Sequence, residues 1–204
     1  KKATEVKLVP ISRLKKIKQR TLEEGVKLIL ESLGYNLKDE DIRDTPRRVA
    51  RTWIKELSSE QKLKKLFAVF PSEYESMIVL TNHRAFTRCP HHLERVILDV
   101  NIGYIPDGKL LGLSKLARIA DYFSRGLMLQ EEIADGIAIG LMDALKPKGV
   151  AVYLEGVHMC MQSRGVETNG KVTTSKMLGI FLEDSYKGLA AREEFLAIIR
   201  RGGK

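Results

Sequence analysis

The sequence is poor in the residues that build disulfide scaffolds and aromatic binding surfaces. It has two cysteines, four histidines and one tryptophan, and aromatic residues make up 6% of the chain. In a cytosolic chain, a cysteine pair of this kind is more often metal-binding, catalytic or simply buried than disulfide-bonded. Charges interrupt every apolar stretch before it reaches membrane-spanning length, and no secretory apolar segment opens the sequence. We therefore expect a cytoplasmic protein with no membrane partner.

Positive charge is in excess, and it bears on the class of partner. Lys and Arg number 35 against 26 Asp and Glu, which gives a formal net charge of +9. Such a surplus attracts nucleic acids, membranes and small phosphorylated substrates alike. A zinc-stabilised nucleic-acid-binding module would interleave aromatic and basic residues, and no such stripe is present. The composition thus argues against a nucleic-acid-binding module, and the charge alone names no partner.

The N-terminal part of the chain, residues 1–75, is predicted to be a helical region. Apolar residues recur at helical spacing from Leu22 to Leu33, after a capping box at Thr21–Glu24 and before Gly34, which suits the position after a helix. A second helix is expected to start at Thr45 as its cap, with Pro46 in the first turn.

Residues 76–204 have the pattern of a second domain that contains both strands and helices. Alternation of apolar and polar residues, turn residues and helical periodicity together give the order of its elements. The expected elements are strands at 77–80, 96–102, 150–157 and 173–182, and helices at 114–123, 130–145 and 189–200. Strand pairs that flank a helix pair predict an α+β fold, in which an antiparallel sheet carries helices on one face.

Both cysteines have histidines beside them, and this grouping indicates a metal site. Cys89-Pro90-His91-His92 and His158-Met159-Cys160 hold both cysteines and three of the four histidines. Thiolate and imidazole are the ligands that Zn²⁺ prefers, and two thiolates with one imidazole leave a tetrahedral position open. An ion with an open position can activate water as a nucleophile, and neighbouring histidines can move protons.

Spacing alone leaves three interpretations of this grouping. The ion can be catalytic, with an open position for water. It can instead be structural, with His91 or His158 as the fourth ligand. The third interpretation is that there is no metal and that the cysteines are buried, unliganded residues.

Six segments in a fixed order resemble the GTP cyclohydrolase I family. The resemblance runs from about residue 23 to residue 181. Its segments are Asp44–Ala50, Cys89–His92, Tyr104–Pro106, Gly112–Arg118, Gln130–Glu131 and His158–Gly165.

The resemblance implies a T-fold, a homodecamer with active sites at subunit interfaces, and a zinc-dependent reaction. In that reaction GTP and water give 7,8-dihydroneopterin triphosphate and formate. Carried over by position, the zinc ligands are Cys89, His92 and Cys160. His158 is expected to donate a proton near the imidazole part of guanine, and His91 to act as an acid or base around the ribose.

The same resemblance assigns the substrate contacts. Glu131, helped by Gln130, is expected to hold the guanine edge, because a carboxylate accepts two parallel hydrogen bonds. The triphosphate is expected to bind a set of four residues, of which three are basic. They are Ser114, Lys115, Arg118 and Arg164.

The sequence also departs from the family pattern at some positions. Pro90 stands where the family usually has Glu, and Gly126 and Met128 replace an Arg and a Gln. The alternative function is a related T-fold enzyme that acts on another purine or pterin. Whether the product serves folate, tetrahydrobiopterin or deazaguanine synthesis is open at this stage.

Overall fold

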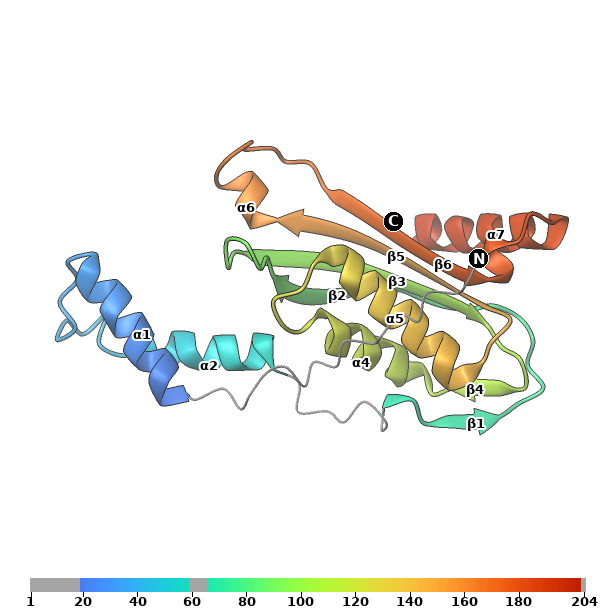
Figure 1. Ribbon diagram of the computed structural model, residues 1–204, viewed down its shortest axis with the longest axis horizontal. Coiled ribbons are helices and arrows are strands. Elements are labelled where there is room, and N and C mark those ends of the chain that lie inside the picture. Colours follow the sequence, from blue (N-terminus) through green and yellow to red (C-terminus); the bar gives the residue numbers. More distant parts are fainter. Residues whose placement is uncertain (1–18, 59–65, 203–204) are drawn as a thin grey trace, which may run out of the picture. The chain divides into compact units, whose positions relative to one another are not determined.

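The computed structural model describes residues 19–58 and 66–202, and these fall into two compact units that divide near residue 60 (Figure 1). The first unit contains α1 (Gln19–Ser32) and α2 (Thr45–Leu57). The second contains the β-sheets and the remaining helices. The domain boundary at residue 75 stays a prediction; β1 (Val69–Pro71), which precedes it, pairs with β4 (Lys109–Leu111) of the second unit.

The end of α1 matches the prediction, and its start does not. Gly34 has a φ of +82°, and the N–H of Tyr35 donates to the carbonyl of Leu30 at 3.0 Å, which is the hydrogen-bond pattern of a Schellman motif. Thr21 lies inside the helix, because α1 already includes Gln19. The capping box predicted at Thr21 is therefore wrong.

The cap of helix α2 is one residue earlier than predicted. Asp44 is the residue before the helix, and Thr45 is the first helical residue. The Asp44 carboxylate contacts Arg47 at 3.1 Å and Arg48 at 3.8 Å. Thr45 is thus not the cap, and Pro46 lies in the first turn, as predicted.

The second unit is built on a four-stranded antiparallel sheet in the order β2-β3-β5-β6. The strands are β2 (Ile78–Arg88), β3 (Arg95–Ile105), β5 (Gly149–His158) and β6 (Val172–Gly179). Strand β2 is longer than predicted, because a bulge between Leu80 and His83 breaks the alternation that marks a strand. Strand β6 ends earlier than predicted, at Gly179 with a φ of +63°, and Ile180–Leu182 form a 3₁₀ turn.

One face of this sheet is covered by α4 (Leu113–Ser124) and α5 (Gln130–Leu145), as Figure 1 shows. The main core lies between these helices and alternate residues of β3, which are Val96, Leu98, Val100, Ile102 and Tyr104. These residues are almost fully buried. This is the predicted α+β arrangement, an antiparallel sheet with a helix pair on one face.

The last helix, α7 (Tyr186–Gly202), packs against the other face of the sheet. Its Phe195 is fully buried against Ala151 and Phe181. The close approach requires Gly103 on β3, because a Cβ atom there would lie 2.7 Å from the Phe195 ring. The order of elements in the sequence did not predict this second, smaller core.

Candidate metal centre and active site

The sheet register brings the two cysteine segments to the same end of the second unit. Thr87 pairs with Val96, and Val96 pairs with His158, so these three residues form a row across β2, β3 and β5. Cys89 lies two residues beyond Thr87, and Cys160 lies two residues beyond His158. The antiparallel pairing therefore assembles the site from segments far apart in the sequence.

Cys89 lies at the start of the turn between β2 and β3. Its N–H donates to the carbonyl of Glu94 at 2.9 Å, and its own carbonyl accepts from the N–H of Leu93 at 2.9 Å. Pro90 is the first residue inside this turn, where a fixed φ is tolerated and a missing N–H costs little. The Pro90 departure from the family pattern is thus compatible with the backbone of the loop.

Cys160 lies in α6 (Met159–Gln162), a single helical turn that follows β5 directly. The turn is closed by Ser163, whose N–H donates to the carbonyl of Met159 at 2.9 Å. Cys160 is half-buried, whereas Cys89 is buried, and neither forms a disulfide. Burial and the neighbouring Cys89 thiol raise the pKa of Cys160, and Arg164 opposes this shift.

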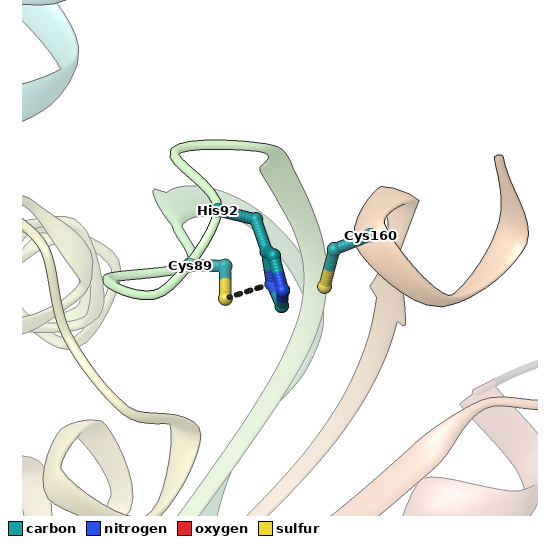
Figure 2. Close-up of side chains that lie close together, drawn as sticks. All are labelled: Cys89, His92 and Cys160. Atoms are coloured by element: carbon teal, nitrogen blue, oxygen red, sulfur yellow. Dashed lines mark hydrogen bonds between the residues drawn. The ribbon is translucent and has the colours of Figure 1, made fainter. Parts of the chain in front are cut away.

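The ligand atoms of Cys89, His92 and Cys160 all lie within 4.8 Å of one another (Figure 2). Cys89 Sγ and His92 Nδ1 are 3.6 Å apart. A tetrahedral Zn²⁺ with a Zn–S bond of about 2.3 Å and a Zn–N bond of about 2.0–2.1 Å would place sulfur and nitrogen at about this separation. The donor set and its spacing therefore fit zinc.

His91 lies close to the same cluster. Its Nδ1 is 3.8 Å from Cys89 Sγ, and its ring centroid is 6.2 Å from that of His92. Both histidines are exposed. Among the described residues, the group of atoms within mutual reach of one ion contains His92 and not His91.

His158, at the end of β5, is held by Gln130, the first residue of α5. His158 Nε2 lies 2.9 Å from Gln130 Oε1. Burial lowers the pKa of His158, and the nearby Glu131 carboxylate partly opposes this effect. The residues predicted for guanine binding and for proton donation thus lie side by side.

The four residues predicted for the triphosphate do not gather at this site within one chain. Arg164 is near Cys160 and acts on its pKa. Ser114 and Lys115 lie in the first turn of α4, which follows β4 at the far end of the sheet (Figure 1). At about 1.5 Å per residue, Ser114 lies about 15 Å along the helix from Ser124. Arg118 lies midway along α4.

The other end of α4 leads back to the metal cluster. Thr87 Oγ1 donates to the carbonyl of Gly126 at 3.1 Å, and Arg88 forms a bridge to Leu127. The loop between α4 and α5 therefore runs along the end of β2, and it places Gln130 and Glu131, at the start of α5, next to the site. Gly126 has a φ of +120°, which an L side chain rarely adopts, so glycine suits this position.

The sequence comparisons show the family. The model of the family GTP cyclohydrolase I matches residues 22–200. The chain belongs to the GTP cyclohydrolase I family of enzymes. The predicted α+β class, an antiparallel sheet with helices that follows an N-terminal helical segment, is confirmed.

Two curated relatives illustrate the similarity. The chain is 42% identical over 182 residues to GTP cyclohydrolase 1 of Drosophila melanogaster, with 87% of this chain and 55% of that protein covered. It is 39% identical over 186 residues to GTP cyclohydrolase 1 of Coxiella burnetii, with 89% of this chain and 98% of that protein covered. The chain thus spans about half of the fly protein and nearly all of the bacterial one.

Solved structures give a weaker likeness. An archaeosine synthase QueF-Like in the apo form is 22% identical with a TM-score of 0.42. The match covers 51% of this chain and 94% of the synthase chain. An E. coli dihydroneopterin aldolase in complex with neopterin is 14% identical with a TM-score of 0.39. The match covers 50% of this chain and 98% of the aldolase chain.

Within residues 19–58 and 66–202, no helix is long and apolar enough to cross a membrane.

Sequence reasoning missed the residues that support the site. Gly156, inside β5, leaves the space in which Gln130 meets His158. A glycine within a strand often marks a close approach, so that signal was available. The fourth histidine, His83, lies apart from the cluster and contacts Asp121 of α4 at 2.9 Å.

Proposed function

We propose that this protein hydrolyses and rearranges GTP to 7,8-dihydroneopterin triphosphate and formate in a zinc-dependent reaction. Membership of the GTP cyclohydrolase I family supports the reaction class. The observation that carries the proposal is the Cys89, His92 and Cys160 cluster, which lies beside two further histidines. A reducing compartment such as the cytoplasm would keep both thiols available to the metal.

Cys89, His92 and Cys160 would hold the ion through two sulfurs and one imidazole nitrogen. This ligand set leaves one position of a tetrahedral ion without a protein ligand. When bound, zinc would activate a water molecule for attack on the guanine ring. Because Cys160 comes from across the sheet, the site forms only in the folded chain.

His158 and His91 would move protons on either side of the cluster. His158 directly precedes the helical turn that holds Cys160, and the Glu131 carboxylate is near it. From there it can protonate the ring nitrogen of guanine as the neighbouring carbon is attacked. His91 is exposed beside Cys89, where it can serve the steps around the ribose. Glu131 would accept hydrogen bonds from the guanine edge, next to the donor.

The triphosphate pocket would be shared between subunits. Arg164 lies at the metal cluster, whereas Ser114, Lys115 and Arg118 lie on a helix that starts at the opposite end of the sheet. One chain therefore offers one of the four predicted phosphate contacts, Arg164, at its own cluster. A homo-oligomer, a decamer by the resemblance, would bring α4 of a second subunit to complete the site.

A substrate comparison tests this proposal. The purified protein is incubated with GTP and, separately, with guanosine, and formate is measured together with pterin fluorescence after oxidation. We expect formate from GTP alone, because guanosine lacks the phosphates that the basic residues hold. Equal turnover of guanosine would remove the triphosphate assignment, and turnover of another purine in place of GTP would favour the related enzyme.

A further inference from the structure

The buried amide of Gln130 is bound so that its two ends are distinguishable. Gln130 is 4% exposed, and its Nε2 lies 2.9 Å from the carbonyl oxygen of Val172 and 3.4 Å from that of Leu154. It also lies 3.0 Å from Thr174 Oγ1. A carbonyl oxygen only accepts hydrogen bonds, so the NH₂ group of Gln130 must face the β5–β6 pair.

The opposite end of the amide therefore faces His158. Gln130 Oε1 carries no hydrogen, and it lies 2.9 Å from His158 Nε2. The bond requires a proton on Nε2 of the imidazole. In the neutral ring this leaves Nδ1 without a proton, and in the charged ring both nitrogens carry one.

Gly156 makes this contact possible. It lies two residues before His158 on β5, so both residues are on the same face of the strand. A Cβ atom at position 156 would overlap Gln130 Oε1 and would lie 3.1 Å from His158 Nε2. The overlap is with the end of a flexible side chain, so a small residue there would displace the amide before it displaced the backbone.

We propose that Gln130 is a positioning residue that fixes the Nε2–H form of His158 and thereby makes Nδ1 the atom that exchanges protons with the substrate. The proposal rests on the proposed function for the role of His158 in turnover. The tautomer itself follows from the contacts of Gln130 alone. Gln130 then acts on catalysis through His158 and not through the guanine ring.

The first test reads the tautomer without any turnover. Solid-state ¹⁵N spectra of histidine-labelled, zinc-loaded protein distinguish protonated from unprotonated ring nitrogens, and the four histidines are few enough to assign against His158→Ala. We expect His158 to show a protonated Nε2 in the wild type. Gln130→Met should lose this Nε2–H signal, because Met is similar in size but has no amide. Gly156→Ala should also lose it, because the added Cβ displaces the Gln130 amide.

The second test is a double-mutant cycle on GTP turnover. Gln130→Met should lower kcat about 10- to 100-fold, the usual effect of removing an orienting partner, with KM little changed. In the His158→Ala background the same change should have no further effect on kcat, because the group that it orients is gone. Zinc content should stay at the wild-type level in all of these variants.

Asp135→Asn provides the matched control. Asp135 lies on the same helix and forms an ion pair with Lys176 of β6 at 2.9 Å, so its loss also weakens the contact between α5 and β6. This variant should keep the wild-type kcat and the Nε2–H signal. An equal loss in Asp135→Asn would show that Gln130 acts only as a structural tie.

Two further results would also overturn the proposal. One is an unchanged Nε2–H signal in both Gln130→Met and Gly156→Ala. The other is an equal effect of Gln130→Met with and without His158. If the wild type did not convert GTP at all, the proposed function would fail while the spectra would still decide the tautomer.

Discussion

At the scale of single residues, the two adjacent histidines of the Cys89 loop must be told apart. Their Nδ1 atoms lie 3.6 Å and 3.8 Å from Cys89 Sγ, yet His92 is the one that also comes within reach of Cys160. We expect His92→Ala to lose most of its zinc and His91→Ala to retain it, because a ligand set of two sulfurs cannot hold the ion as tightly.

Metal analysis of the two purified variants measures this difference. Each variant is the control for the other, because both truncate an exposed histidine side chain in the same turn. Equal zinc loss in both variants would mean that His91 is also a ligand, and a site closed by four protein ligands would be structural.

The role of His158 can be separated from that of the ligands. His158→Ala should keep its zinc and its affinity for GTP, because His158 contacts Gln130 and is not one of the three candidate ligands among the described residues. Turnover should fall by about 10²–10⁴, the usual loss when a general acid or base is removed. Steady-state kinetics, GTP binding and metal content on one preparation check this, and release of the metal would contradict it.

The candidate metal ligands were visible in the sequence, whereas the residues that position the side chains around them were not. The grouping of cysteines and histidines could be picked out from the residue types, and the family resemblance then named Cys89, His92 and Cys160 as the ligands. A glycine within a strand, such as Gly156, signals a close approach, but that signal does not say that Gln130 is the residue that fills the space. Contacts between elements cannot be read from local pattern, so these residues required the structure.

At the scale of elements, regular patterns were predicted well and interrupted ones were not. Helix α5 runs from Gln130 to Leu145, as its apolar spacing and the following Lys146–Gly149 break indicated. The second half of β2 was missed, because Asn82 has a φ of +52° at the bulge and polar residues follow it. A bulge shifts the alternation by one residue, which hides a strand from a period-two search.

The smaller core beneath α7 gives a test of stability at this scale. Phe195→Ala should destabilise the protein by about 3–5 kcal/mol, the usual cost of deleting a buried aromatic ring. The ring is fully buried against Ala151 and Phe181. Glu194→Ala, at the exposed neighbouring position, is the control and should change the unfolding free energy little. Denaturant unfolding measures both, and equal effects would contradict the assigned core.

At the scale of the whole molecule, the separation of the predicted phosphate residues leads to a prediction about assembly. Cys160→Ser should inactivate the metal cluster, and Arg118→Ala should inactivate the phosphate helix α4. If each active site combines the cluster of one subunit with α4 of another, mixed oligomers contain some intact sites. Random mixing should restore about a quarter of the wild-type activity.

Co-expression of the two variants with different affinity tags, followed by tandem purification, provides the mixed oligomer. Each variant alone serves as the control and should stay nearly inactive. A mixed oligomer without recovered activity would show that each site is completed within one chain. The sequence could not settle this point, because periodicity and spacing describe one chain at a time.

The central claim, zinc-dependent release of formate from GTP, is tested most directly by metal removal and restoration in one assay. The protein as purified should contain about one zinc per chain and release formate in step with a pterin that fluoresces after oxidation. Chelation should abolish both signals, and added Zn²⁺ should restore both together. Formate release that persists after complete removal of zinc, or its absence from fully zinc-loaded protein given GTP, would contradict the account.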